Sequence, residues 1–245
     1  MLILVHSPKG GSGSSFLAAS LAATLARRGQ QVAAIDFTFQ DTLKLYLGLL
    51  PTQPVIEMSA RVGEAMVVAG VEIMSGHIFS REQAFIDGIR AGDSPLLDKE
   101  RIIFADIGSE DRELRGFLLD HAALHICPIL PRSASLATLS KVQPGTPTVA
   151  LEKTVFVLNQ LDDRRQLSRH THNFIRELVG DKLLGTVRYD EAINDTLAMF
   201  QPLEKFAPSS ALIPDLERLT DALQLRLGLG GSVHGGGDVQ KATAQ

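Results

Sequence analysis

The stretch "LILVHSPKGGSGSSFLAASLAATLARRG", residues 2–29, contains an apolar run, a glycine-rich segment and a helical pattern, in that order. The run at 2–5 is typical of a buried strand, and the apolar residues of 15–28 have the spacing of an amphipathic helix. Glycines at 10, 11 and 13 allow the backbone to turn and to present its N–H groups to an anion. The following helix points its positive end at the same place. This order predicts a phosphate-binding loop rather than an ordinary tight turn.

Short apolar runs alternate with helical patterns along the rest of the chain. Their near-continuous apolarity and β-branched content predict strands that are covered on both faces. The alternation predicts a three-layer α/β fold with a doubly wound, mostly parallel sheet of about seven strands. The section 49–70 has no clear pattern and begins as a loop at its two prolines. The expected strands are 2–5, 32–35, 71–74, 102–105, 124–128, 154–158 and 183–187, and the expected helices are 15–28, 81–90, 112–121, 134–141, 165–179, 191–200 and 214–227.

Length and composition allow one large α/β domain or two small ones, followed by a disordered, glycine-rich tail over 229–245. The 245 residues are 44% hydrophobic and 21% charged, as in ordinary globular proteins. The single cysteine excludes an internal disulfide framework and fits a reducing compartment. A signal peptide and a bilayer-spanning run are not expected, so we predict a cytoplasmic protein. The net charge of −4 gives no global attraction to nucleic acid or anionic lipid.

The loop K-G-G-S-G-S-S resembles the deviant phosphate loop of the ParA/MinD class of P-loop ATPases, usually K-G-G-x-G-K-[ST]. The resemblance implies that ATP and Mg²⁺ are bound, that Ser15 is a magnesium ligand, and that Lys9 reaches the nucleotide of a partner across a homodimer. Ser14 departs from the pattern, because the family has a lysine there. Losing a charge-assisted contact of that kind costs about 1.5–3 kcal/mol, which weakens binding without excluding it. The nucleotide-binding positions predicted in the loop are Lys9, Gly10, Gly11, Ser12, Gly13, Ser14 and Ser15.

Two further stretches resemble the switch segments of that class. "VAAIDFTFQDTLKLYLGL" (32–49) is similar to switch I, which usually ends D-x-D, and Asp36 matches the first aspartate. The second, which orients the attacking water, falls on Thr38, which cannot act as a carboxylate. Asp41 and Gln40 are candidates to replace it. "RIIFADIGSED" (101–111) resembles the Walker B strand. The resemblance implies a metal site of Ser15, Asp106 and Asp36, and no catalytic residue is assigned beyond the candidates Lys9, Asp36 and Asp41.

The resemblance continues to about residue 228, which implies a single MinD/ParA-like nucleotide-binding domain over residues 1–228. "TVFVLNQLDDRR" (154–165) matches a strand that ends in asparagine, which implies that Asn159 recognises adenine. "GTVRYDEAINDTLAMFQPLEKFAPSSA" (185–211) matches the closing segment, and Arg188 is included among the predicted nucleotide-binding residues.

Loss of both the loop lysine and the switch I aspartate is most similar to the BcsQ group of cellulose-biosynthesis proteins. That resemblance implies an ATP-binding dimeric switch with weak or no hydrolysis, which serves protein components of a cellulose secretion complex at the inner membrane. The alternatives are a slow ATPase that positions another envelope machine, such as the pilus-assembly group CpaE/TadZ, and a nucleotide-free scaffold.

Three other features are interpreted as structural. His125 and Cys127 lie on one expected strand with no second pair nearby, so burial is favoured over metal binding. The arginine-rich stretch 164–176 is more typical of a solvated helix face than of a nucleic-acid or lipid site. The last expected helix carries mixed charges, which disfavours a direct membrane anchor.

Overall fold

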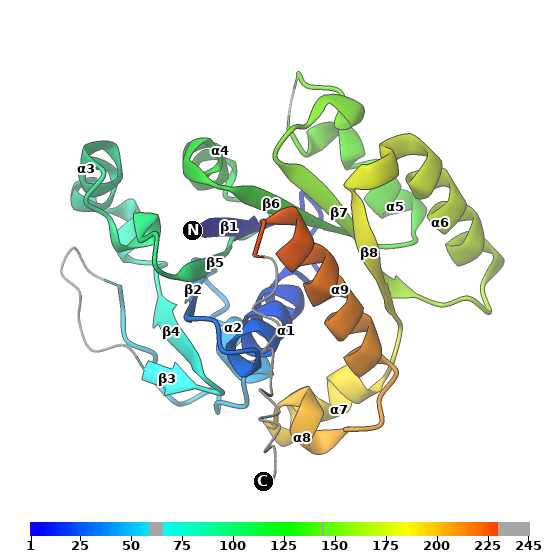
Figure 1. The fold of residues 1–245 in the computed structure, drawn as a ribbon, viewed down its shortest axis with the longest axis horizontal. Helices are drawn as coiled ribbons and strands as arrows, with labels where there is room; N and C mark the ends of the chain where they lie inside the picture. The colour runs from blue at the N-terminus through cyan, green and yellow to red at the C-terminus, as the bar shows by residue number, and fades with distance from the viewer. Residues whose placement is uncertain (59–65, 144, 230–245) are drawn as a thin grey trace, which may run out of the picture.

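The computed structural model describes residues 1–58, 66–143 and 145–229, which form an eight-stranded sheet between two layers of helices (Figure 1). The strand order is β3-β4-β2-β5-β1-β6-β7-β8, and every pairing is parallel except β3 with β4. The predicted doubly wound α/β fold is therefore confirmed. The strands are β1 (Leu2–Val5), β2 (Val32–Asp36), β3 (Met66–Val68), β4 (Val71–Ser75), β5 (Ile102–Asp106), β6 (Leu124–Ile129), β7 (Thr154–Leu161) and β8 (Leu183–Arg188).

Alternate residues of the central strands face the two helical layers. Ile3 and Val5 of β1 pack with α1 (Ser14–Arg27) and α9 (Leu212–Arg226), whereas Leu2 and Leu4 pack with α3 (Gln83–Ala91) and α4 (Arg112–His121). Both sides of the sheet are thus apolar, as a parallel sheet requires. The remaining helices are α2 (Leu43–Tyr46), α5 (Ser133–Leu136), α6 (Gln166–Val179), α7 (Ala192–Met199) and α8 (Leu203–Phe206).

Two sequence expectations differ from the structure. An eighth strand, β3, lies in the section that had no clear pattern, and it pairs antiparallel with β4 at the edge of the sheet. The helix expected over 134–141 is instead α5 followed by a 3₁₀ turn at Leu139–Lys141. Thr138 donates both its backbone N–H and its hydroxyl to the carbonyl of Ser135, and this local bonding competes with a continuous α-helix. The tail expected over 229–245 lies outside the described residues apart from position 229.

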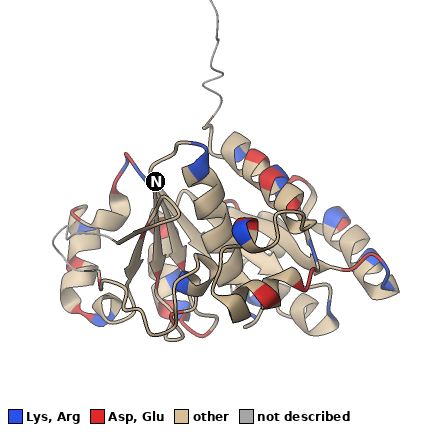
Figure 2. Ribbon diagram, turned by 90° about the horizontal axis from the view of Figure 1, so that it is seen from below, with Lys and Arg blue, Asp and Glu red and all other residues tan. Residues whose placement is uncertain are grey.

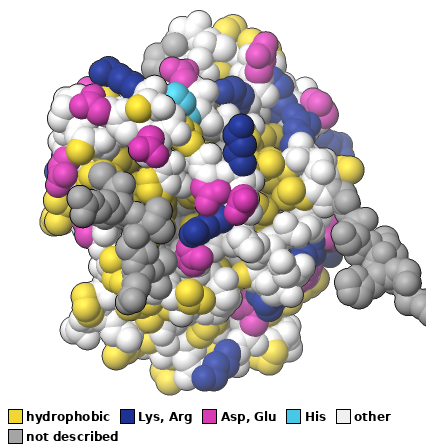
Figure 3. Space-filling model, turned by 60° about the vertical axis from the view of Figure 1, so that its left-hand side comes forward, with side chains coloured by type: hydrophobic (Ala, Val, Ile, Leu, Met, Phe, Trp, Pro, Cys, Tyr) yellow, Lys and Arg dark blue, Asp and Glu magenta, His cyan; other side chains and the backbone are white. Residues whose placement is uncertain are grey.

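Basic and acidic residues alternate along the outer helices and the loops (Figure 2). Arg27 and Arg28 at the end of α1 form ion pairs with Glu217 of α9, so these two helices are linked as well as packed. On the side of the molecule that carries β3 and β4, exposed apolar side chains lie among charged ones (Figure 3). Among the described residues, every helix is too short or too polar to cross a bilayer.

The carboxyl ends of β1, β5, β6, β7 and β8 meet at one edge of the sheet. β1 and β5 are neighbours in the sheet, and the chain passes from β1 to β2 on one side and from β5 to β6 on the other, so a topological switch point lies at their carboxyl ends. Ligands of open α/β sheets bind in the crevice at such points.

Candidate functional site

The loop between β1 and α1 has the conformation that its glycines predict. Gly11 and Gly13 have φ values of 74° and 90°, in the left-handed region that favours glycine. A Cβ atom on Gly13 would lie 2.2 Å from the amide nitrogen of Asn159. The Gly13 carbonyl accepts the backbone N–H of Leu17, which begins the hydrogen bonding of α1. The loop is therefore directly continuous with the N-terminus of α1, where further backbone N–H groups are available to an anion.

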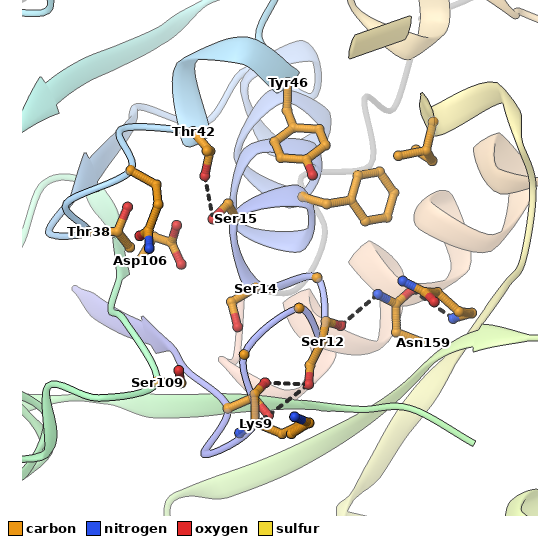
Figure 4. Close-up of a pocket in the computed structure, with 18 of the residues that line it drawn as sticks. Lys9, Ser12, Ser14, Ser15, Thr38, Thr42, Tyr46, Asp106, Ser109 and Asn159 are labelled. Carbon is orange, nitrogen blue, oxygen red and sulfur yellow. Dashed lines mark hydrogen bonds between the residues drawn. The ribbon is translucent and has the colours of Figure 1, made fainter. Parts of the chain in front are cut away.

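Side-chain hydrogen bonds hold this loop in place (Figure 4). The Ser12 hydroxyl donates to the Lys9 carbonyl at 2.6 Å and accepts from the Ser7 hydroxyl at 3.1 Å. Asn159, near the end of β7, donates its amide N–H to the Ser12 carbonyl at 2.9 Å. Neither Ser14 nor Ser15 takes part in these bonds. The phosphate loop is thus preorganised, which reduces the entropic cost of binding an anion.

A cavity of about 620 Å³ opens above the loop. All seven predicted loop residues line it, together with Asp106, Asn159 and Arg188, so the structure brings most of the predicted site together. Asp36 and Asp41 are not among the lining residues, but Gln40 is. The cations among the described lining residues are Lys9, Arg132 and Arg188.

Two buried carboxylates end neighbouring strands beside the cavity. Asp106 of β5 and Asp36 of β2 are register partners and are at most 1% exposed. Burial raises the pKa of Asp106 well above its usual range, and repulsion from Asp36 raises it further. The nearby Ser15 hydroxyl, which stabilises the charged form, lowers the pKa. Burial likewise raises the pKa of Asp36, although hydrogen bonds from Thr38 and Leu43 oppose the shift.

The two carboxylates differ in what they contact. Asp36 accepts three hydrogen bonds: from the Thr38 N–H at 2.8 Å, the Thr38 hydroxyl at 2.6 Å and the Leu43 N–H at 3.0 Å. Both oxygens of Asp106 lack a hydrogen-bond partner among the described residues. A buried polar group without a partner is rare and needs an explanation.

A magnesium ion fits that explanation. Mg²⁺ prefers oxygen ligands and is held by one or two carboxylates, with substrate phosphates completing the site. Asp106 supplies an unpartnered carboxylate, and the Ser15 hydroxyl at the start of α1 lies close to it. These two residues would hold the ion, which would neutralise phosphate charge. Direct ligation of the metal by Asp36 stays a prediction. Its oxygens already accept hydrogen bonds from Thr38 and Leu43 of switch I.

Asp41 of switch I does not line the cavity. Asp41 has a φ of 50° and forms an ion pair with Lys44 at 2.6 Å, while the Lys44 ammonium also donates to the Gln53 carbonyl. Thr38 lines the cavity, but its hydroxyl is donated to Asp36. Gln40 is therefore the better placed of the two candidates for the missing aspartate.

Asn159 and Arg188 line the opposite end of the cavity and have structural partners. The Asn159 amide holds the phosphate loop, and its oxygen accepts the Gln160 N–H. The Arg188 guanidinium contacts the Asp215 carboxylate at 2.9 and 3.0 Å and the Ala211 carbonyl at 2.8 Å, which ties β8 to α9. That contact with Asp215 raises the pKa of Arg188. Roles of Asn159 and Arg188 in nucleotide binding remain predictions.

Sequence reasoning missed several lining residues, namely Arg132, Gln160, Tyr189 and Tyr46. Three of them follow or end parallel strands, so the predicted strand ends were the signal that could have found them. Gln160 has a φ of 57°, a strained value for a residue with a side chain, and its oxygen accepts a hydrogen bond from Arg132 at 3.4 Å.

The residues interpreted as structural have structural surroundings. His125 is fully buried, with its ring nitrogens beside the Thr154 hydroxyl and the His6 carbonyl, and Cys127 lies in the core beneath α5 and α6. Arg164 and Arg165 both pair with Asp162 at the start of α6.

Three solved structures share this fold. A ParA family ATPase from Chlorobium tepidum is 20% identical, with 91% of this chain and 98% of that chain covered and a TM-score of 0.70. MinD from Pyrococcus horikoshii, complexed with Mg-ADP, is 18% identical over 95% and 99% of the two chains, with a TM-score of 0.70. The MinC:MinD cell division complex of Aquifex aeolicus matches at 14% identity over 91% and 96%, with a TM-score of 0.69.

No curated protein matches the sequence. The family model of the CobQ/CobB/MinD/ParA nucleotide-binding domain matches residues 3–203, which is most of the chain. This match agrees with the glycine loop, the strand order and the buried aspartate at the end of β5. The chain therefore belongs to the CobQ/CobB/MinD/ParA nucleotide-binding domain family.

Proposed function

We propose that this chain is an ATP- and Mg²⁺-binding, MinD-like accessory protein that works as a nucleotide-held switch with weak or no hydrolysis. The observation that carries the proposal is a braced phosphate loop beside the unpartnered, buried carboxylate of Asp106. A buried carboxylate without a hydrogen-bond partner destabilises the fold, and a bound cation would supply the missing partner.

Slow chemistry follows from the charges that are missing. Phosphoryl transfer depends on positioning and on stabilising charge, and a loop lysine contributes to both. Ser14 carries no charge, and the Thr38 hydroxyl is donated to Asp36 instead of to the cavity. Gln40, a neutral side chain at the cavity, is the residue left in switch I to orient a water molecule. We expect turnover of roughly 10⁻² s⁻¹ or less, well below ordinary enzyme rates.

Dimerisation is proposed from Lys9. It is exposed at the cavity rim, and among the described residues no carboxylate lies within ion-pair distance of it. Such a lysine is available to the nucleotide of a second copy, where a contact shielded between two subunits is stronger than an exposed ion pair.

The partners are proposed to be protein components of a bacterial cellulose secretion complex, which would recruit the protein from the cytoplasm to the inner membrane. Support comes from the resemblance of the degenerate loop and of the closing segment 185–211 to the BcsQ group. The Aquifex MinD structure shows a relative in complex with a protein partner, MinC, so a protein partner is in keeping with this fold.

Calorimetric titration with ATP and with ADP, each with and without Mg²⁺, tests the binding step. We expect saturable binding that Mg²⁺ strengthens, and loss of the Mg²⁺ effect in Asp106→Ala. Flat curves with both nucleotides at millimolar concentration would favour the scaffold alternative. Hydrolysis well above about 10⁻² s⁻¹ would instead favour the alternative of a true ATPase that positions another envelope machine.

Cellulose output tests the pathway. In a cellulose-producing host that lacks this gene, we expect the wild-type chain to restore output and Lys9→Ala to fail at equal protein level. Normal output without the gene would contradict the cellulose assignment and leave the nucleotide switch intact.

A further inference from the structure

The switch I residue Thr42 contacts the phosphate loop directly. Its hydroxyl donates to the Ser15 hydroxyl at 3.2 Å, and both side chains line the cavity (Figure 4). The sequence offered no reason to select Thr42, because the resemblance placed the switch I function on the aspartate positions. The contact links two segments on either side of the expected metal position.

The spacing of the two hydroxyl oxygens suits one ion. Mg²⁺ holds its ligands in an octahedron at about 2.0–2.1 Å, so two neighbouring ligand oxygens are about 3.0 Å apart. The Thr42 and Ser15 oxygens, at 3.2 Å, are already within a few tenths of an ångström of that separation. Small adjustments of two half-buried side chains would complete the pair.

Asp36 is arranged to position Thr42 and has little capacity left for a metal. Its Oδ1 accepts two hydrogen bonds from Thr38, and its Oδ2 accepts the N–H of Leu43, the residue after Thr42. The carboxylate therefore fixes the backbone on both sides of the segment 38–43. This bonding directs the Thr42 hydroxyl toward Ser15.

We infer that Thr42 is a switch I ligand of the bound Mg²⁺, beside Ser15 and Asp106, and that Asp36 is the residue that positions it. The inference rests on the proposed function, since it needs a metal–nucleotide complex at this site. In the structure the Thr42 hydroxyl donates a hydrogen bond to the Ser15 hydroxyl. A metal ligand must offer a lone pair, so both hydroxyl oxygens turn their lone pairs to the ion and that hydrogen bond is given up.

The metal would thereby control the conformation of switch I. Thr42 directly precedes α2, whose Tyr46 lines the same cavity, so the hydroxyl lies between the metal and a short helix. The same segment carries Phe39, which is 79% exposed. Occupancy of the metal site would be reported at the surface through this segment.

Binding of Mn²⁺ in the presence of saturating ADP, followed by the electron paramagnetic resonance signal of free Mn²⁺, tests the ligand. We expect Thr42→Val to raise the Mn²⁺ dissociation constant about tenfold or more, since even supporting residues of metal sites have effects of 10–100-fold. Thr42→Ser keeps the hydroxyl and should stay within about twofold of the wild type. Thr52→Val, an exposed position that does not line the cavity, is the matched control and should bind as the wild type does.

Equal Mn²⁺ affinity in Thr42→Val and the wild type would overturn the inference, as would equal losses in Thr42→Val and Thr42→Ser. If the wild type itself fails to bind ADP or Mn²⁺, the proposed function fails and not this inference alone.

A second measurement does not depend on the folding of a Thr42 variant. The chain has no tryptophan, so Phe39→Trp places a single fluorescent reporter on switch I. With ADP bound, adding Mg²⁺ should shift the emission of Phe39→Trp, and adding Thr42→Val to it should remove the shift. Emission that does not respond to Mg²⁺, although calorimetry shows the metal bound, would overturn the inference.

Discussion

Two buried histidines are expected to make a destabilising contribution to the nucleotide-free protein in mild acid. His6 is 1% exposed, and neither of its ring nitrogens has a hydrogen-bond partner among the described residues. Burial, with repulsion from His125 and Arg115, lowers the pKa of His6 to about 3. Burial also lowers the pKa of His125 to about 4, in a ring 5.8 Å from His6. Both rings are therefore mostly neutral in the folded chain above about pH 5.

The sign of the pH effect follows from comparing the two states. An unfolded histidine has a pKa near 6.5, so on acidification the unfolded chain takes up protons that the folded chain cannot. The contribution of the two neutral histidines to stability is complete well above pH 6.5 and falls as the pH approaches the folded pKa values. An unfolded histidine is already half protonated at pH 6.5, so between pH 6.5 and 5.0 each histidine removes about 1.6 kcal/mol and the pair about 3 kcal/mol. The raised pKa values of Asp36 and Asp106 act in the opposite direction, because acid then protonates the folded chain first.

Comparison with a variant isolates the histidine effect from that of the aspartates. We expect urea denaturation of His6→Leu to show about 1.6 kcal/mol less loss between pH 6.5 and 5.0 than the wild type. The change is close to volume-conserving and also removes two unpartnered nitrogens, so stability at pH 7.5 should not fall by more than about 1.5 kcal/mol. His170→Leu, at an exposed position of α6, should follow the wild-type pH profile. Parallel losses in the wild type and His6→Leu would refute the reasoning.

Four other outcomes are expected. Asp106→Asn should raise the stability of the metal-free protein by ~1–3 kcal/mol in urea denaturation, because the buried charge is removed, and should abolish the effect of Mg²⁺ on ATP affinity in calorimetry. Ser14→Lys should tighten ATP binding by about tenfold or more, and the uncharged Ser14→Met should not. Lys9→Ala should fold normally yet lose any ATP-dependent increase in mass by light scattering. Gly13→Ala should reduce the melting temperature and ATP binding together, because its φ and the nearby Asn159 amide both oppose a side chain.

The sequence was sufficient for the strands that are buried on both faces. Continuous apolar runs such as 102–105 coincide with observed strands to within a few residues, because burial on both sides leaves only one kind of side chain possible. The edge strand β3 was missed since its pattern is short and its middle residue, Val67, is exposed. Pairing with β4 depends on the turn at Ala69 and Gly70, both with positive φ, and only the glycine is typical of such a turn.

The sequence was enough to predict which residues lie at the candidate site, but it did not predict the hydrogen bonds among them. Family resemblance assigned Asp36 and Asp106 alike, because both end strands beside the loop. Which of the two is free depends on how the segment after Asp36 folds back, and no spacing rule gives that. Asp41 illustrates the same limit, since it forms an ion pair with Lys44 and does not line the cavity that Gln40 reaches.

The contacts of the phosphate loop show what the absence of a lysine at position 14 changes and what it leaves unchanged. The bonds that shape the loop run through Ser7, Ser12 and Asn159, and the turn itself depends on Gly11 and Gly13. Position 14 contributes to none of them, so the change to serine leaves the cradle intact while removing a cation from it. A chain that needed only the fold would not require the positive-φ glycines of the loop or an unpartnered carboxylate at Asp106. An intact loop and an available carboxylate beside an uncharged position 14 therefore support the proposal of nucleotide binding without rapid turnover.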